Sequence, residues 1–183
     1  LASAYAEAGF GIKNPKVGLL NNGTEEHKGD PLRQTTYQLM KKMDVIDFVG
    51  NVEGRDIMMS DVDVVVADGF SGNIALKSME GCGKLVLGVM KKEFGATLRT
   101  KIGYLIIKPA INKMRKQLDF DGVGGALLLG LKKVVVKSHG SSKPKTIAAS
   151  IANAASIYRN DLIGKVENLL AGVDWQNLAP KDE

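Results

Sequence analysis

The fold of this chain is decided by the run Asp63-Val64-Val65-Val66-Ala67-Asp68-Gly69-Phe70-Ser71-Gly72-Asn73-Ile74-Ala75-Leu76-Lys77. Apolar β-forming residues lead directly into an acid, two glycines, a hydroxyl and an amide, and a helical pattern follows at once. This order is typical of a buried parallel strand that delivers polar groups to the amino end of the next helix, where N–H groups favour an anion. The run therefore predicts a phosphate site at the carboxyl end of a strand.

Three further runs are typical of buried strands, because each is continuous rather than alternating and rich in valine, isoleucine or leucine. With the run at 63–68, they are residues 16–21, 45–50 and 133–138. Helical patterns separate the four strands, so we expect an α/β fold whose mainly parallel sheet is covered by helices on both faces. The length of 183 residues fits one domain, 1–183.

Two helices frame this sheet in the prediction. Asp30 is placed to cap a helix that has Pro31 at its first position, which is a strong start signal. After the fourth strand, an amphipathic stripe over 147–169 predicts one long closing helix.

Composition restricts the class of protein. The chain has one cysteine, Cys82, so an internal disulfide and a zinc site built on paired cysteines are excluded, and a reducing cytoplasm is expected. It has no charged and apolar leader, and no apolar run reaches the roughly 18 residues of a spanning helix, so we expect neither export nor a membrane span. Because the first residue is Leu1 and a helical pattern is already in progress there, we expect that an amino-terminal part is absent.

Cys82 also allows a chemical interpretation, as an acyl-accepting nucleophile. It lies on the apolar face of a predicted helix, between glycines and without an adjacent basic residue to lower its pKa. We therefore expect it to be a packed residue.

The formal charge of +5 is unevenly distributed. Residues 84–118 hold nine basic side chains against one acid, Glu93. Gly95, Gly103 and Pro109 argue against one continuous helix, so we expect two helices that meet near 95–100 as a projecting basic hairpin, an insertion at 84–118.

The basic segment has three interpretations: a solvated helical face, a surface for nucleic acid, or contact with anionic lipid. Stacking aromatics are nearly absent from it, which disfavours nucleic acid. Aliphatic residues that alternate with cations favour an interfacial membrane helix. The expected membrane contacts are Leu98, Ile102, Leu105, Ile106 and Lys108.

Polar turn residues follow each predicted strand, and a parallel sheet brings such turns to one edge. Asn22-Gly23 and Asp68-Gly69 can equally be turns that need a positive φ, and a lone histidine such as His139 is often structural. The Gly-Ser-Ser-Lys that follows His139 favours function, because its hydroxyl and N–H groups are suited to phosphate. The candidate site residues are Asn22, Gly23, Lys28, Asp68, Gly69, Ser71, Gly72, Asn73, Lys77, His139, Gly140 and Ser141.

Four motifs resemble one known family. They are Leu19-Leu20-Asn21-Asn22-Gly23-Thr24-Glu25-Glu26-His27-Lys28-Gly29, Gly50-Asn51-Val52-Glu53-Gly54-Arg55-Asp56, Asp68-Gly69-Phe70-Ser71-Gly72-Asn73 with Lys77 and Glu80-Gly81, and Gly124-Gly125-Ala126-Leu127-Leu128-Leu129-Gly130 followed by Lys137-Ser138-His139-Gly140. In this order they resemble the bacterial phosphate acyltransferases of phospholipid synthesis, and the resemblance covers nearly the whole chain.

This resemblance implies a fold and a reaction. The fold is a three-layer α/β/α sandwich similar to phosphotransacetylases and isocitrate dehydrogenase-like enzymes, and it works as a homodimer. Inorganic phosphate attacks the thioester of a long-chain acyl-acyl carrier protein and gives an acyl phosphate. The enzyme is cytoplasmic and peripherally associated with an anionic membrane, and we expect no cofactor, no metal and no nucleic acid. Because family members carry roughly another half of sequence, the chain is similar to their carboxyl-terminal part.

The resemblance also suggests residue roles. Lys28, Lys77 and the Gly72-Asn73 helix start hold phosphate, and Asn22 or Asn73 donates to the developing oxyanion. His139 orients phosphate or takes its proton, and Asp68 positions a cation or a backbone donor. Two other functions stay open at this point: a related phosphate acetyltransferase that uses coenzyme A, and a non-catalytic basic binding module.

Overall fold

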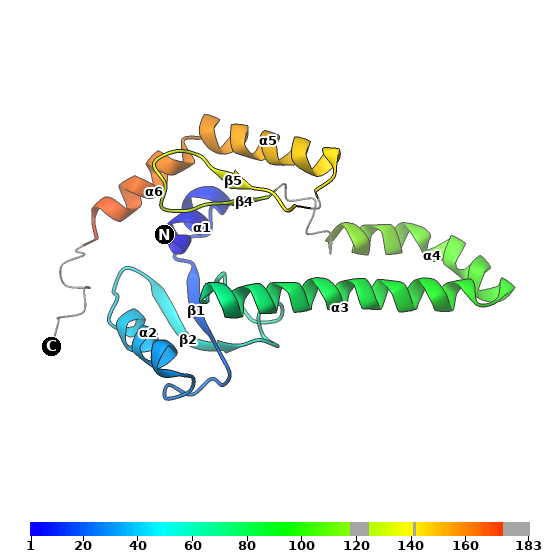
Figure 1. The fold of residues 1–183 in the computed structure, drawn as a ribbon, viewed down its shortest axis with the longest axis horizontal. Helices are drawn as coiled ribbons and strands as arrows, with labels where there is room; N and C mark the ends of the chain where they lie inside the picture. Colours follow the sequence, from blue (N-terminus) through cyan, green and yellow to red (C-terminus); the bar gives the residue numbers. More distant parts are fainter. Residues whose placement is uncertain (118–124, 141, 174–183) are drawn as a thin grey trace. The chain divides into compact units, whose positions relative to one another are not determined.

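The computed structural model of this chain describes residues 1–117, 125–140 and 142–173, and the side chains up to residue 114 of the first range. It divides into two compact units, one of Leu1–Gly72, Leu128–Val135 and the residues from Ala155 onward, the other of Asn73–Leu127 and Val136–Ala154. The elements are α1 (Ala2–Phe10), β1 (Lys16–Asn21), α2 (Pro31–Lys41), β2 (Asp47–Glu53), β3 (Val64–Val66), α3 (Gly69–Gly95), α4 (Leu98–Gln117), β4 (Ala126–Leu127), β5 (Val136–Lys137), α5 (Pro144–Arg159) and α6 (Leu162–Ala171) (Figure 1).

The first unit is built on a parallel sheet of three strands in the order β2-β1-β3. This sheet confirms the predicted α/β class with a mainly parallel sheet. Its register shifts after Val17, which pairs with Phe48, while Gly18 pairs with Gly50. A side chain on Gly18 would lie 2.3 Å from Val52, so glycine is needed for the close approach of the two strands.

One side of this sheet packs against α2, which lies beside β1 and β2 (Figure 1). The core between them centres on Val17, Leu19 and Met40, each at most 8% exposed. Tyr37 of α2 meets Phe48 of β2 edge-on, with ring centroids 5.1 Å apart. The burial of this apolar stripe fixes the direction of α2 and hence the position of its amino end.

The start of α2 confirms the sequence prediction. Asp30 is the N-cap, with an extended backbone and a side-chain oxygen that accepts from the amide of Arg33 at 3.0 Å. Pro31 occupies the first helical position, where its missing N–H costs nothing.

The prediction of one long closing helix over 147–169 is wrong, because the structure has two helices there. α5 ends at Arg159 and α6 begins at Leu162, with Asp161 in the left-handed region at φ 46°. In the first unit, α6 packs on α1, and its Leu162 and Val166 are buried. The break lets the apolar stripe of α6 follow α1.

Three predicted strands differ from the observed ones. The strand predicted at 63–68 is shorter and covers Val64–Val66. The second runs over Asp47–Glu53 rather than 45–50, so Asn51 lies in β2 and not in the turn after it. The predicted parallel strand at 133–138 is instead the short β5, which pairs antiparallel with β4 in a separate sheet. Gly125, at φ 90°, allows this pairing, because a side chain there would lie 2.7 Å from the Lys137 carbonyl oxygen.

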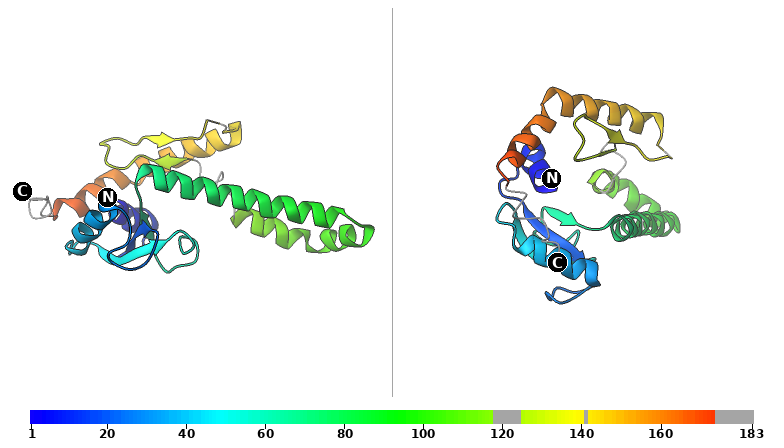
Figure 2. Two further views of the ribbon diagram at one scale, coloured as in Figure 1. Left: turned by 60° about the horizontal axis from the view of Figure 1, so that its bottom comes forward. Right: turned by 60° about the vertical axis from the view of Figure 1, so that its left-hand side comes forward.

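Residues Ala96 and Thr97 connect helices α3 and α4, within the predicted interval of 95–100, and the two helices run in opposite directions beside each other (Figures 1 and 2). Thr97 and Thr100 cap α4 reciprocally, because each hydroxyl accepts from the other residue's amide at 3.1 Å. The predicted packing of the apolar face of α3 is wrong within the described residues. None of its described side chains is buried, and Cys82 is exposed.

Candidate functional site

A polar cavity of about 610 Å³ opens at the carboxyl ends of β1 and β3 in the first unit. Three predicted site residues, Asn22, Asp68 and Ser71, line it together. The strands are parallel neighbours, so their following turns lie at the same edge, as the sequence predicts. The full lining is Leu20, Asn21, Asn22, Gly29, Asp30, Leu32, Arg33, Asp68, Phe70 and Ser71.

Asp68 is the cap of α3. One of its carboxylate oxygens accepts from the amides of Phe70 and Ser71, both at 2.9 Å. The hydrogen bond from the Ser71 amide is the largest of the effects that lower the pKa of Asp68 to about 2, and the nearby Arg33 charge adds to it. Asp68 is therefore an anion at every physiological pH.

This cap changes how the helix start can hold phosphate. The first amides of α3 already donate to the Asp68 side chain, and the Gly72 amide donates to the Asp68 carbonyl oxygen at 2.9 Å. Gly69 is exposed, and a Cβ atom added to it would meet no other atom within 4 Å. A Cβ atom added to Gly72 would lie 3.4 Å from the methyl group of Ala67. The amides of Phe70, Ser71 and Gly72 are therefore already engaged at this helix start.

Arg33 is a site residue that the sequence reasoning missed. Its guanidinium donates to Asp30 at 2.5 Å, to the Ser71 hydroxyl at 2.6 Å and to the Asp68 carboxylate, and its side chain is only 17% exposed. The spacing to Asp30 predicts only a local pair on one helix. The partners on α3 lie 35 and 38 residues away, and no sequence pattern indicates them.

Two buried asparagines support the loop over 22–29, which carries the predicted Asn22, Gly23 and Lys28. Asn21 donates to the Lys28 carbonyl oxygen at 3.0 Å and accepts from the Asn22 amide at 2.9 Å. Asn51, on the neighbouring strand, donates to the Glu25 carbonyl oxygen at 2.8 Å. The side-chain amides of Asn21 and Asn51 thus fix the backbone of the loop, while the Asn22 side chain is exposed. The Lys28 ammonium lies 3.8 Å from Glu25.

The second unit brings together two other predicted residues, Lys77 and His139. The Lys77 ammonium lies 3.5 Å from Nε2 of His139, although 62 residues separate them in the chain. Glu80, which was not among the predicted site residues, accepts from Lys77 at 2.9 Å and 3.2 Å. Asn73 and Gly140 are exposed in the same unit, and Ser141 lies outside the described residues.

The expected membrane residues lie on α4, and all are exposed. The exposed fractions are 76% for Leu98, 53% for Ile102, 66% for Leu105 and 76% for Ile106, and Lys108 is exposed as well.

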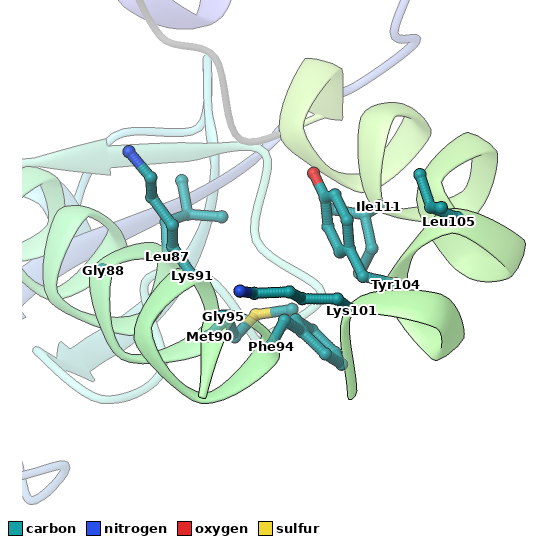
Figure 3. A pocket seen from close by; sticks show the side chains of 10 residues that line it. All are labelled: Leu87, Gly88, Met90, Lys91, Phe94, Gly95, Lys101, Tyr104, Leu105 and Ile111. Carbon is teal, nitrogen blue, oxygen red and sulfur yellow. The ribbon is translucent and has the colours of Figure 1, made fainter. Parts of the chain in front are cut away.

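An apolar cavity of about 670 Å³ lies between α3 and α4, and Leu105 is one of the residues that line it (Figure 3). Phe94 and Tyr104 face each other there, with ring centroids 5.5 Å apart. Among the described residues that line this cavity, the charged ones are Lys91 and Lys101, and none is a predicted catalytic residue. Its lining is Leu87, Gly88, Met90, Lys91, Phe94, Gly95, Lys101, Tyr104, Leu105 and Ile111.

Two other features are absent from the part of the chain that the structure describes. Over 1–117, 125–140 and 142–173, no helix has the length and apolar character that crossing a membrane requires. The same residues contain no cluster of three or more histidine, cysteine, aspartate or glutamate side chains suited to a metal ion.

Comparison with known proteins gives one consistent result. The chain is 46% identical over 173 residues to a phosphate acyltransferase of Streptococcus pneumoniae, which covers 94% of this chain and 52% of that protein. It is 48% identical over 167 residues to a phosphate acyltransferase of Streptococcus pyogenes serotype M6, covering 91% of this chain and 50% of that protein. The chain thus spans about half the length of the curated relatives it matches. A family described as "Fatty acid synthesis protein" matches residues 1–165, and the chain belongs to this family.

Proposed function

We propose that this chain takes part in transferring a long-chain acyl group from acyl-acyl carrier protein to inorganic phosphate, which supplies acyl phosphate for phospholipid synthesis. The observation that carries the proposal is the 48% identity to a phosphate acyltransferase over 91% of the chain. The polar cavity in the first unit and the Lys77–His139 contact in the second supply groups that fit such chemistry.

The reaction makes modest demands on its site. A phosphate oxygen forms a bond to the thioester carbonyl carbon, the carbon–sulfur bond breaks, and the carrier leaves as a thiolate. A thiol has a pKa near 8.5, so it leaves without strong acid assistance. Positioning of phosphate and stabilisation of the oxyanion therefore dominate, and one well-placed donor contributes roughly 3 kcal/mol.

The proposed roles differ between the two units. In the first, Lys28 contributes a cation to phosphate binding, Asn22 is a donor for the oxyanion, and Asp68 fixes the Arg33 cation and the first amides of α3. In the second, Lys77 contributes a cation, Asn73 is the alternative oxyanion donor, and His139 orients phosphate or takes its proton. The residues proposed to surround phosphate are Gly23, Gly69, Ser71, Gly72, Gly140 and Ser141.

The whole chain is proposed to have a more specific fold than the parallel sheet alone defines. We infer one α/β domain over 1–183 of the three-layer sandwich type found in phosphotransacetylases and isocitrate dehydrogenase-like enzymes, working as a cytoplasmic homodimer. The strand order β2-β1-β3, with α2 between β1 and β2, supports it, since right-handed parallel crossovers build that class.

The segment 84–118 is proposed to be a basic amphipathic helical insertion that contacts an anionic membrane surface. Its support is the exposure of Leu98, Leu105 and Ile106 on a segment rich in cations. Aliphatic groups that enter the headgroup region and lysines that meet anionic lipid are the two ingredients of interfacial binding. The acidic carrier protein competes for the same cations.

The test is an assay of carrier-thiol release from palmitoyl carrier protein, with and without inorganic phosphate. It is made on this chain and on a version extended to the full length of its relatives. We expect release that depends on phosphate in the extended version and is slower with acetyl coenzyme A as donor. Preference for acetyl coenzyme A would replace the proposed substrate, and release independent of phosphate in both chains would refute the proposed reaction.

A further inference from the structure

The cavity between α3 and α4 is a second candidate site, separate from the polar groups described above (Figure 3). Its described lining residues all lie within 87–111, a range that belongs to the second unit. They recur at intervals of three, four or seven positions, with Leu87, Met90 and Phe94 on α3 and Lys101, Tyr104 and Ile111 on α4. Each helix therefore turns one face towards the cavity.

The size and polarity of the cavity suit a small amphiphilic molecule. Its volume of about 670 Å³ falls within the range of about 300 to 1,000 Å³ that is usual for small-molecule sites. Apolar and aromatic side chains make up most of the lining, and Lys91, Lys101 and the Tyr104 hydroxyl are its polar groups. A mainly apolar pocket with a few polar groups is the common form of such a site.

Two glycines help to keep this space open. Gly88 and Gly95 line the cavity, and a Cβ atom added to either would meet no other atom within 4 Å. Gly88 lies well inside α3, where glycine is a poor helix former. A larger side chain at position 88 would therefore occupy the cavity without displacing a neighbour.

The cations of the lining are complementary to an anionic group. Lys91 belongs to α3 and Lys101 to α4, and the side chain of Lys101 extends towards α3 (Figure 3). Within the part of the chain whose side chains are described, neither ammonium has an ion-pair partner. Glu93, the one acid of the segment 84–118, is not among the described lining residues. An anion attached to an apolar body fits this combination of charge and surface.

We propose that this cavity binds an acyl phosphate, with the acyl chain among the apolar side chains and the phosphate paired with Lys91 and Lys101. Bound in this way, the chain stays out of water after the acyl group has left its carrier. The pairing of an apolar chain with an anionic head stands on the lining alone. The choice of an acyl phosphate as the natural occupant rests on the proposed function. Of the residues proposed for membrane contact, Leu105 is the one that is also among the described lining residues.

A phosphonate with an alkyl chain tests the site, because it joins an apolar chain to a stable head that resembles phosphate. The dissociation constant of dodecylphosphonate is measured by calorimetric titration of this chain, below the concentration at which the probe forms micelles. Each fully buried CH₂ group strengthens binding by about fourfold, so octylphosphonate should bind about tenfold more weakly or worse. Equal affinity for the two probes, or no binding of dodecylphosphonate, overturns the proposal.

The chain-binding part is tested by Gly88→Leu, which fills the cavity. This variant should weaken dodecylphosphonate binding by about tenfold or more, while α3 is kept because leucine is the better helix former. Circular dichroism checks that helix content is retained. Gly83→Leu is the matched control, since Gly83 lies on the same helix with nothing within 4 Å of its Cβ position and is not among the lining residues. Its dissociation constant should stay within about twofold, and equal constants in the two variants overturn the assignment of the cavity.

The head-binding part is tested by combining Lys91→Gln with Lys101→Gln. Loss of both cations should weaken dodecylphosphonate binding by about tenfold, because charge-assisted contacts to the head are removed. Lys92→Gln combined with Lys113→Gln removes the same charge at exposed positions that are not among the lining residues, and should change binding by no more than about twofold. Equal losses in the two pairs would show that only the overall charge acts, and would overturn the assignment of the head.

A further measurement separates this inference from the proposed function. The probe titration needs neither carrier protein nor phosphate, and it is repeated on the extended version. If that version releases no thiol with phosphate, the proposed function fails, and the probe titration alone decides whether the cavity binds an anionic amphiphile. If it forms acyl phosphate but binds no probe, or binds it equally well with Gly88→Leu, the present inference alone fails. A dimer that dissociates in Gly88→Leu but not in Gly83→Leu, with no probe bound, assigns the cavity to a second copy of the chain instead.

Discussion

Arg33 on α2 donates a hydrogen bond to Asp68, the residue that caps α3. The same guanidinium donates to Asp30, the cap of α2, so one side chain joins the first turns of two helices. Both helices begin beside the cavity at the carboxyl ends of β1 and β3. A planar group with five donors is suited to such a bridge, and a lysine is not.

The stability of the first unit should depend on the charge of Asp68 in acid. The pKa of Asp68 is lowered from 3.8 to about 2, so its ionised form stabilises the fold above pH 3.8 and this contribution is lost as the pH falls towards 2. Asp68→Asn keeps an acceptor for the cap but removes the charge opposite Arg33. Denaturant unfolding should therefore show Asp68→Asn as less stable at pH 7, with a difference that shrinks between pH 3.8 and about 2.

The control for this experiment is Asp44→Asn, at an exposed position that has no part in the contacts of Asp68 and Arg33. Its unfolding curve should run parallel to that of the unsubstituted chain over the same pH range. If the Asp68→Asn difference also stays constant with pH, the carboxylate does not act through its charge.

Gly29 should tolerate no side chain. Its φ is 88°, and a Cβ atom there would lie 2.5 Å from the Asn21 amide oxygen that holds the loop. Gly29→Ala is therefore expected to lower the free energy of unfolding by about 2 kcal/mol, measured by denaturant titration. Gly54→Ala, which meets nothing within 4 Å, should change it by less than about 0.5 kcal/mol. Equal effects of the two substitutions would contradict the described loop geometry.

Membrane contact is tested on α4 by Leu105→Glu combined with Ile106→Glu. Two carboxylates at these exposed positions oppose both insertion and attraction to anionic lipid, so sedimentation with anionic vesicles should fall at least tenfold. Phosphate-dependent thiol release in solution should stay within about twofold, because neither residue belongs to the polar site.

The matched control for α4 is Ile151→Glu combined with Tyr158→Glu on α5, where the exposed fractions are 66% and 78%. This variant should sediment with vesicles as the unsubstituted chain does. Equal loss in both variants would show that general surface charge, rather than the face of α4, controls binding.

Asn73→Ala in the extended version tests the oxyanion donor of the second unit. Removal of one such donor is expected to lower kcat by about 100-fold to 1000-fold with little change in the KM for phosphate. Ser78→Ala, at an exposed position of the same helix, should leave kcat unchanged. A rate within about threefold of the unsubstituted protein would exclude Asn73 from this role.

Local signals account for the parts of the fold that the sequence predicts correctly. β1 runs over Lys16–Asn21, as predicted from a continuous apolar run, and α2 begins at Pro31 with Asp30 as its cap. Both depend on neighbours within a few residues, where side-chain chemistry and backbone geometry are directly linked. Asn22, Asp68 and Ser71 come together because parallel strands place their following turns at one edge.

Long-range contacts account for the errors and omissions. A continuous apolar run does not distinguish a parallel from an antiparallel strand pair. The sequence at 133–138 therefore does not indicate that β5 pairs antiparallel with β4. Arg33 and Glu80 were missed because their spacing to Asp30 and Lys77 indicates only ordinary pairs on a helix surface. The contact of Arg33 with Asp68, and that of Lys77 with His139, are set by the folded chain alone.

The most direct test of the central claim follows the oxygen atoms of phosphate. The extended version is incubated with palmitoyl carrier protein and phosphate labelled with ¹⁸O in all positions, and the acyl phosphate is analysed by mass spectrometry. Attack of phosphate on the thioester carbon predicts an acyl phosphate that retains all four labelled oxygens, formed in equal amount with the carrier thiol. Free unlabelled fatty acid as the initial product, with no acyl phosphate, would contradict the account.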